Sequence, residues 1–315
     1  MQDLRIVFFG TPHFAVTTLK TLVENNRNVV GVITAPDKPA GRGRHLNQSA
    51  VKEYALTRNL KILQPTNLKS EEFFEELKAL KPDLQIVVAF RMLPQSVWSL
   101  PKLGTFNLHA SLLPQYRGAA PINWAIINGE SKTGVTTFFI DDKIDTGEII
   151  EQMEVPISPS DNAGSLHDKL MVTGSELVLK TVNLIALGKV QTQKQQNSEP
   201  LKTAYKLHTE NTKIDWNKSV EEIHNLVRGL SPYPSAWSYF VNGTEEMTVK
   251  IYSTLPEITS HTEQTGVIIS TKKELKVAVK DGYIYVKEIQ LPGKKRMAIV
   301  SLLNGFKIEN GATMR

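Results

Sequence analysis

Short apolar runs alternate with segments of helical periodicity through the first 187 residues, and this alternation constrains the fold more than any other feature. The first apolar run, Leu4–Phe9, is closed by Gly10, and hydrophobic residues then recur at helical spacing as far as Val23. A second apolar run covers Val29–Ile33. A strand, a turn, a helix and a second strand in this order indicate a βαβ unit.

The same order of elements recurs further along the chain. We expect strands at Lys61–Leu63, Leu84–Ala89, Gly104–Leu108, Val135–Ile140 and Glu148–Val155, and helices at Glu71–Leu80, Pro121–Ile127 and Ala163–Leu187. Strands that alternate with helices form an open, mostly parallel sheet with helices on both faces. The sequence therefore predicts a Rossmann-like α/β domain over residues 1–188.

The pattern changes after residue 188. A polar, Gln-rich stretch without periodicity follows, so we expect a linker over residues 189–208. Beyond it we expect one helix, Val220–Leu230, and then short alternating strands separated by Asn-Gly, Asp-Gly and Pro-Gly pairs. These strands are Ala236–Val241, Met247–Tyr252, Gly266–Ile269, Leu275–Val279, Tyr283–Ile289 and Ala298–Leu302. The pattern predicts a small β-barrel or sandwich over residues 209–315.

Charge is distributed unevenly between these two parts. Residues 1–187 hold 19 Lys and Arg against 19 Asp and Glu, whereas residues 188–315 hold 18 against 13. The whole net charge of +5 therefore belongs to the second part. A basic part beside a neutral one is typical of contact with a polyanion such as nucleic acid, although an ordinary lysine-rich surface gives the same count.

Several classes of protein are excluded by what the sequence lacks. There are no cysteines, so no disulfide, thiolate zinc site or cysteine nucleophile can form. The seven histidines show no metal-ligand spacing, and we expect no metal. No run reaches the roughly 18 apolar residues of a spanning helix, and the opening run is too short for a signal peptide, so we expect a cytoplasmic protein. No GxGxxG follows a strand, which argues against a dinucleotide cofactor, and no GxxxxGK[ST] occurs, which excludes a phosphate-binding loop of that kind.

Polar side chains follow two of the expected strands, at the edge where an open α/β sheet binds its ligands. Asn107 and His109 are two residues apart at the end of one strand, so their side chains share a face. An imidazole can move a proton near neutral pH, and an amide N–H can stabilise a developing oxyanion. Asp145 stands in a tight turn after another strand, where a carboxylate could orient His109 and accept a proton. Taken singly, each of the three is equally well an ordinary loop or turn residue.

Together these loops resemble those of the folate-dependent formyltransferases. The resemblance rests on Asn107-x-His109, on the run Ser111-Leu112-Leu113-Pro114-x-Tyr116-Arg117-Gly118-x-x-Pro121, and on Asp145-Thr146-Gly147. The segments Phe9–Ala15 and Pro36–Arg44 are similar to the members of this family that act on methionyl-tRNA. The resemblance covers the whole chain.

The resemblance implies that a formyl group passes from 10-formyltetrahydrofolate to the α-amino group of initiator methionyl-tRNA, in a monomeric enzyme. The family's catalytic residues match Asn107, His109 and Asp145, and its folate-contacting loop matches Ser111–Pro114. Its basic residue for the acceptor end of the tRNA matches Arg42. Its C-terminal OB-like barrel, which contacts tRNA, matches the second domain.

Two basic segments are candidates for contact with RNA. Pro36–Arg44 carries three cations separated by glycines, which is typical of a loop that becomes ordered on RNA, although an ordinary surface loop has the same composition. In the second part, Lys294–Arg296 could add salt-dependent affinity.

Two positions depart from the family pattern on the side expected for the pterin. Arg91 stands in Phe90-Arg91-Met92-Leu93-Pro94, where many relatives have Tyr-Gly before Leu-Pro, and Lys143 stands where the family often has Gly. Two other functions stay open. A sugar-nucleotide N-formyltransferase would share the three polar residues but would usually lack the basic segment, and a non-catalytic RNA-binding protein would leave the three polar residues unexplained.

Overall fold

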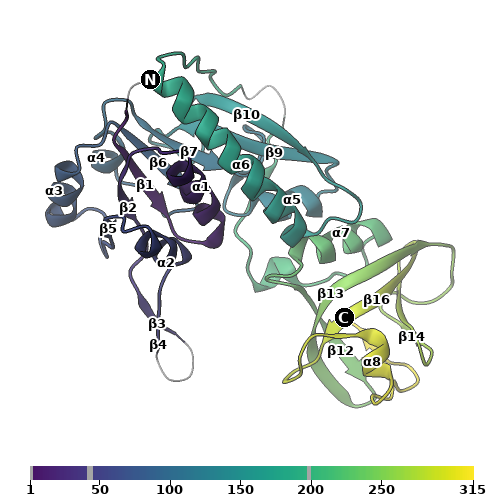
Figure 1. Cartoon of the computed structure of the whole chain (residues 1–315). Coiled ribbons are helices and arrows are strands. Elements are labelled where there is room, and N and C mark those ends of the chain that lie inside the picture. The colour runs from purple at the N-terminus through teal and green to yellow at the C-terminus, as the bar shows by residue number, and fades with distance from the viewer. Residues whose placement is uncertain (1–2, 41–44, 197–199) are drawn as a thin grey trace. The chain divides into compact units, whose positions relative to one another are not determined.

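The computed structural model describes residues 3–40, 45–196 and 200–315 (Figure 1). Its contacts divide the chain into two compact units. Unit 1 contains residues 1–118, 133–156 and 167–203, and unit 2 contains residues 119–132, 157–166 and 204–315. Two internal segments of the first half therefore belong to the unit built mainly from the second half. The predicted division into a domain at 1–188, a linker at 189–208 and a second domain at 209–315 stays a prediction.

A seven-stranded sheet forms the centre of unit 1 (Figure 1). Its strand order is β10-β9-β7-β6-β1-β2-β5. The neighbours from β5 to β7 run parallel, whereas β9 runs antiparallel to β7. The strands are β1 (Ile6–Gly10), β2 (Val29–Ile33), β5 (Ile62–Leu63), β6 (Leu84–Val88), β7 (Thr105–His109), β9 (Lys132–Phe139) and β10 (Ile149–Pro156). The predicted mostly parallel α/β sheet is confirmed.

The helices of this part include two that the sequence did not predict. They are α1 (His13–Glu24), α2 (Ala50–Thr57), α3 (Glu71–Ala79), α4 (Gln95–Trp98) and α6 (Ala163–Ala186). The first unpredicted helix, α2, begins where the Ser49 side chain accepts a hydrogen bond from the N–H of Lys52, an N-cap signal that the periodicity search missed. The other, α4, has only four residues, too few to show a period. A short antiparallel pair, β3 (Lys38–Ala40) and β4 (His45–Asn47), precedes α2.

The packing of β7 decides which of its side chains reach the end of the sheet. Phe106 and Leu108 are buried in the core, and Asn107 and His109 alternate with them. Because successive side chains of a strand point to opposite faces, Asn107 and His109 lie on the same face, as the spacing of two predicted. In the register with β9, His109 lies opposite Thr136.

Unit 2 contains an antiparallel barrel with strand order β14-β15-β16-β13-β12-β18. The main-chain N–H of Met314 donates to the carbonyl of Gly266 at 2.8 Å, and the N–H of Ile268 donates to that of Ala312 at 3.0 Å. These bonds join the two ends of the sheet, so the barrel is nearly closed, and the predicted barrel is confirmed. Its strands are β12 (Ala236–Asn242), β13 (Glu245–Ile258), β14 (Ile268–Ser270), β15 (Leu275–Val279), β16 (Gly282–Gln290), β17 (Met297–Ala298), which pairs with β16, and β18 (Thr313–Met314).

The remaining elements of unit 2 are mostly helical. They are α5 (Pro121–Ile127), η1 (a 3-10 helix, Thr209–Thr212), α7 (Val220–Leu230) and α8 (Ile299–Leu303). Two short strands outside this group, β8 (Arg117–Gly118) of unit 1 and β11 (Thr203–Ala204), which begins in unit 1, pair with each other. The side chain of Ser219 accepts from the N–H of Glu222, and the Glu222 side chain accepts from the N–H of Ser219, which is a capping box at the start of α7.

One secondary-structure prediction in the barrel is wrong. Residues Ala298–Leu302 were expected to form a strand, but Ile299–Leu303 form α8. Ile299 and Leu302, three residues apart, are buried, whereas Val300 between them is exposed. A five-residue segment with four apolar side chains fits either a strand or a short helix, so only the position of the core could decide between them. Within the described residues, no helix combines the length and the apolar character that crossing a bilayer requires.

Candidate active site

The ring of His109 is held by the backbone of the loop that follows it. His109 is 7% exposed, and its Nε2 atom lies 2.8 Å from the carbonyl oxygen of Tyr116. Because a carbonyl can only accept, Nε2 carries a proton and donates it. Tyr116 has a φ of 61°, a left-handed conformation that a residue with a side chain adopts only when its surroundings impose it. The loop therefore fixes the orientation of the imidazole.

The other ring nitrogen faces a carboxylate from a distant part of the sequence. Nδ1 of His109 lies 3.8 Å from Oδ2 of Asp145. This distance is longer than a hydrogen bond but short enough for a strong charge interaction when the imidazole is protonated. Oδ2 of Asp145 also accepts the main-chain N–H of Gly118 at 2.9 Å. The structure thus brings together two residues, His109 and Asp145, that the sequence singled out separately.

The turn that carries Asp145 depends on the residues beside it. Asp145 has a φ of 56°, in the left-handed region, and the Thr146 hydroxyl donates to the Asp141 carboxylate at 2.8 Å. A Cβ atom on Gly147 would lie 1.7 Å from the carbonyl oxygen of Phe139, so only glycine fits there. Thr146 and Gly147 therefore allow the tight packing of the turn, and Asp145 presents its carboxylate from it.

The loop Ser111–Pro114 is fixed by a buried hydroxyl on the neighbouring strand. The Thr136 hydroxyl donates to the carbonyl of Ser111 at 2.6 Å and accepts the N–H of Leu113 at 3.2 Å. The Gln152 amide donates to the carbonyl of Leu113 and to the Thr136 hydroxyl, both at 2.9 Å. Sequence reasoning missed Thr136 and Gln152, whose only signal was a polar residue within each of two expected strands.

The two departures from the family pattern have different surroundings. The guanidinium of Arg91 donates to the main-chain carbonyls of Pro65 and of Thr66, the latter at 3.0 Å, and lies 5.6 Å from the ring centre of Phe90. Lys143 is exposed, and its main-chain N–H donates to Asp141 at 3.0 Å. The charge of Arg91 is therefore satisfied by the protein's own backbone.

The basic segment Pro36–Arg44 is described only in part, and Arg42 lies outside the described residues. The start of the segment is anchored. The Lys52 ammonium and the Gln64 amide both donate to the carboxylate of Asp37, and Gln64 also donates to the carbonyl of Ala35 at 2.8 Å. These hydrogen bonds, first that from Lys52 and then that from Gln64, hold the pKa of Asp37 below its usual value.

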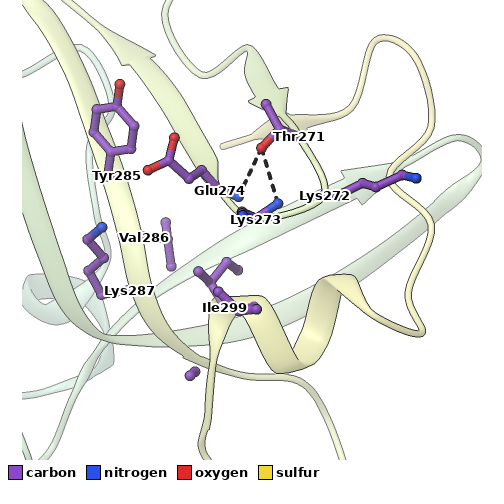
Figure 2. A pocket seen from close by; sticks show the side chains of 10 residues that line it. Thr271, Lys272, Lys273, Glu274, Tyr285, Val286, Lys287 and Ile299 are labelled. Carbon is purple, nitrogen blue, oxygen red and sulfur yellow. Dashed lines mark hydrogen bonds between the residues drawn. The ribbon is translucent and has the colours of Figure 1, made fainter.

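A cationic pocket lies on the barrel (Figure 2). Its volume is about 600 Å³, and its charged lining consists of Lys272, Lys273, Lys287 and one carboxylate, Glu274. The hydroxyl of Thr271 accepts the N–H groups of Lys273 and Glu274 and so fixes the turn that carries Lys272 and Lys273 (Figure 2). The sequence alone does not single out these lysines, because Lys287 lies in β16 and is too far from the other two to form a pattern with them.

The three basic residues that the sequence did select, Lys294–Arg296, are exposed. Arg296 forms an ion pair with Glu288, and its guanidinium lies 4.6 Å from the ring centre of Tyr252. The positive charge of Arg296 therefore already has partners within the barrel. In the described part of the chain, no three His, Cys, Asp or Glu side chains gather closely enough to hold a metal ion.

Comparison with known proteins matches both parts of the chain. The formyl transferase family matches residues 4–182, and the formyl transferase C-terminal domain matches residues 206–307. A protein of Flavobacterium johnsoniae named methionyl-tRNA formyltransferase is 60% identical over 312 residues, which cover 99% of each chain. The protein of the same name from Bacteroides fragilis is 53% identical over 321 residues, with 100% of this chain and 98% of the relative covered.

The fold also recurs in solved structures. The N-formyltransferase of Helicobacter canadensis, solved with folinic acid and dTDP-3-aminofucose, superposes with a TM-score of 0.65 over 90% of this chain and 98% of that one. At 24% identity this likeness concerns the fold alone. The family match and the two relatives at 53% and 60% identity cover nearly every residue of the chain. The chain therefore belongs to the formyl transferase family, among the relatives named methionyl-tRNA formyltransferase.

Proposed function

We propose that this enzyme transfers the formyl group of 10-formyltetrahydrofolate to the α-amino group of methionyl-tRNA. The observation that carries the proposal is the pair His109 and Asp145, whose Nδ1 and Oδ2 atoms lie 3.8 Å apart although the residues are 36 positions apart. Full-length similarity to relatives named methionyl-tRNA formyltransferase supports the choice of both substrates. The same similarity supports a cytoplasmic enzyme, and we propose that it acts as a monomer.

In the proposed reaction the neutral amine attacks the formyl carbon, and a new C–N bond forms. The carbonyl oxygen gains negative charge in the tetrahedral intermediate, which the Asn107 amide and the imidazolium of His109 stabilise. Asp145 takes the proton that the amine loses, directly or through water. The bond between the formyl carbon and the folate nitrogen then breaks, and that nitrogen takes up a proton. No covalent bond to the enzyme is needed.

The hydrogen-bond arrangement decides which atoms serve this reaction. Since Nε2 of His109 donates to Tyr116, Nδ1 is the ring nitrogen that faces the reacting groups. Among the described residues, the Asp145 carboxylate receives its hydrogen bond through Oδ2, so we assign proton transfer to Oδ1. Asn107 lies on the same strand face as His109, where its amide reaches the same substrate oxygen.

We assign the folate to the loop Ser111–Pro114. Hydrogen bonds with Thr136 and Gln152 hold the main chain of this loop. Its other main-chain groups therefore keep one orientation before the folate binds. A loop that is already ordered loses little conformational entropy on binding. The guanidinium of Arg91 donates hydrogen bonds to the carbonyls of Pro65 and Thr66. It therefore does not compete with the main-chain groups that would contact the pterin.

We assign the tRNA to two cationic regions. Arg42 would contact the acceptor end, and the pocket of Lys272, Lys273 and Lys287 would contact phosphates. Contacts between lysine and phosphate release counterions, so this binding weakens as salt rises. The barrel would therefore contribute affinity without contributing to the chemical step.

One experiment tests the proposed function. The purified enzyme is incubated with 10-formyltetrahydrofolate and with either initiator methionyl-tRNA or a dTDP-amino sugar, and formation of tetrahydrofolate is followed. We expect turnover with methionyl-tRNA and none with the sugar. Turnover with the sugar alone would replace the proposal by the sugar-nucleotide alternative, and no turnover with either acceptor would remove it. Arg42→Ala should raise the KM for methionyl-tRNA and leave the KM for folate unchanged.

A further inference from the structure

Thr192 and Gln193, in the first part of the predicted linker, lie against the sheet of unit 1. The N–H of Gln193 donates to the carbonyl of Ile149 at 2.9 Å, and the N–H of Ile149 donates to that of Gln193 at 2.8 Å. This isolated antiparallel bridge extends the sheet beyond β10. The hydroxyl of Thr192 donates to the carboxylate of Glu148 on the same edge. The chain around residue 193 is thus fixed by main-chain pairing.

Two residues further on, the side chain of Gln195 enters the turn that carries Asp145. Its Nε2 amide donates to the carbonyl of Asp145 at 2.9 Å and to that of Gly147 at 2.8 Å. Its Oε1 atom accepts from the guanidinium of Arg117, at 3.0 Å from Nε and 2.6 Å from Nη2. Both amide protons are used, and the reversed amide would place its oxygen against two carbonyls. One half-buried side chain therefore makes four hydrogen bonds of fixed direction.

These bonds join the two segments that meet at the Asp145 carboxylate. The carbonyls that Gln195 binds belong to the turn in which Asp145 has a left-handed φ of 56°. The guanidinium that it binds belongs to Arg117, and the next residue, Gly118, donates its N–H to the Asp145 carboxylate at 2.9 Å. A left-handed backbone costs about 1 kcal/mol or more for a residue with a side chain, so the turn needs partners that hold it.

We propose that Gln195 is a positioning residue for Asp145, and that residues 192–195 are part of the active site. The inference rests on the proposed role of Asp145 in proton transfer. By clamping the turn and Arg117 together, the Gln195 amide sets the distance between the carboxylate and His109. Misplacement of a reacting group by about 1 Å can cost on the order of 100-fold in rate.

The test is a double-mutant cycle on the full-length enzyme. Gln195→Ala and Asp145→Asn are made singly and together, and kcat and the KM for each substrate are measured. We expect Gln195→Ala to lower kcat by about 10- to 100-fold with both KM values within about threefold, since it displaces the carboxylate and not the substrates. In the Asp145→Asn background the same change should have almost no further effect on kcat, because Gln195 acts through that carboxylate.

Gln195→Glu is a second variant that keeps the size of the side chain and the contact with Arg117. It removes both donors to the turn, so we expect the same loss of kcat even where Gln195→Ala folds poorly. The matched control is Gln191→Ala, an exposed glutamine four residues away, which should retain the wild-type kcat.

The outcomes separate this inference from the proposed function. If the wild type formylates methionyl-tRNA and Asp145→Asn is impaired, but both Gln195 variants keep the wild-type kcat, the positioning role is wrong and the function stands. Equal losses of kcat from Gln195→Ala in both backgrounds would also overturn it, because they would show an effect independent of Asp145. If the wild type does not formylate methionyl-tRNA, the proposed function itself fails.

Discussion

The candidate active-site loops of unit 1 and the cationic pocket of unit 2 are built in opposite ways. His109 and Ser111 are buried, and hydrogen bonds fix His109, Asp145 and the loop Ser111–Pro114. The lysines of the barrel pocket are exposed (Figure 2). The first arrangement suits the stabilisation of charge at one atom of a transition state, since fixed dipoles in a site shielded from water act strongly. The second suits attraction to a chain of phosphates, which needs charge but little geometry.

This difference separates two kinds of failure. Removal of one group from the buried site should change the chemical step or unfold a loop. Removal of cations from the barrel should change affinity and its dependence on salt. Substitutions in each region therefore test this division, from the buried site to the barrel surface.

The largest effect is expected from His109→Ala. Loss of the imidazolium that stabilises the negative oxygen of the intermediate should lower kcat by at least about 100-fold, while the affinity for folate changes little. Steady-state kinetics and a folate titration measure the two quantities. His167→Ala, on α6 in the same unit, is the matched control and should retain the wild-type kcat. A His109→Ala enzyme with near-normal kcat would remove His109 from the chemical step.

The next effect is expected from Thr136→Val, which keeps the shape of the side chain but removes the hydroxyl. Ser111, Leu113 and Gln152 then each lose one buried hydrogen bond, and each such loss costs on the order of 1 kcal/mol. We expect a lower free energy of unfolding and a higher KM for folate. Denaturant unfolding and kinetics measure them. Thr136→Ser keeps the hydroxyl and should restore both, and equal defects in the two variants would contradict this account.

A smaller effect is expected in the barrel. Replacement of Lys272, Lys273 and Lys287 by alanine should raise the KM for methionyl-tRNA and leave kcat at saturation unchanged. The slope of the logarithm of affinity against the logarithm of salt concentration should become shallower by about 0.7 to 0.9 for each phosphate that the variant no longer neutralises. The control removes the same charge from unit 1 by replacing Lys20, Lys69 and Lys78. An unchanged slope in the barrel variant would exclude the pocket from tRNA binding.

The smallest effect concerns stability alone. Burial, together with the positive charge of Arg228, lowers the pKa of His224, whose Nδ1 atom lies 2.9 Å from the Thr254 hydroxyl. The unfolded chain therefore binds a proton at His224 more readily than the folded chain does. The contribution of neutral His224 to the free energy of unfolding is accordingly lost as pH falls below about 6.5. His224→Gln should flatten the free energy of unfolding against pH in that range, by at most about 1.4 kcal/mol per pH unit. An equally steep dependence in the variant would contradict this assignment, and kcat should not change.

Much of the fold could be predicted because periodicity is local. Val29–Ile33, Pro121–Ile127, Val220–Leu230 and Leu275–Val279 were predicted with the bounds that the structure has. The predictions failed where a segment was too short to show a period or where an apolar run fitted two elements, as in α8. In such segments the position of the hydrophobic core decides between a strand and a helix, and that position is set by residues far away in the sequence.

The order of an α/β sheet and a barrel, and the shared strand face of Asn107 and His109, could be predicted from the amino acids, because each follows from spacing along one segment. Three other arrangements were visible only after folding: which nitrogen of His109 faces Asp145, the support of the loop Ser111–Pro114 by Thr136, and the contact of Gln195 with the Asp145 turn. These three arrangements join segments 23 to 50 residues apart. Interactions over such separations have no period in the sequence, and they exist only once the sheet has brought the ends of its strands together.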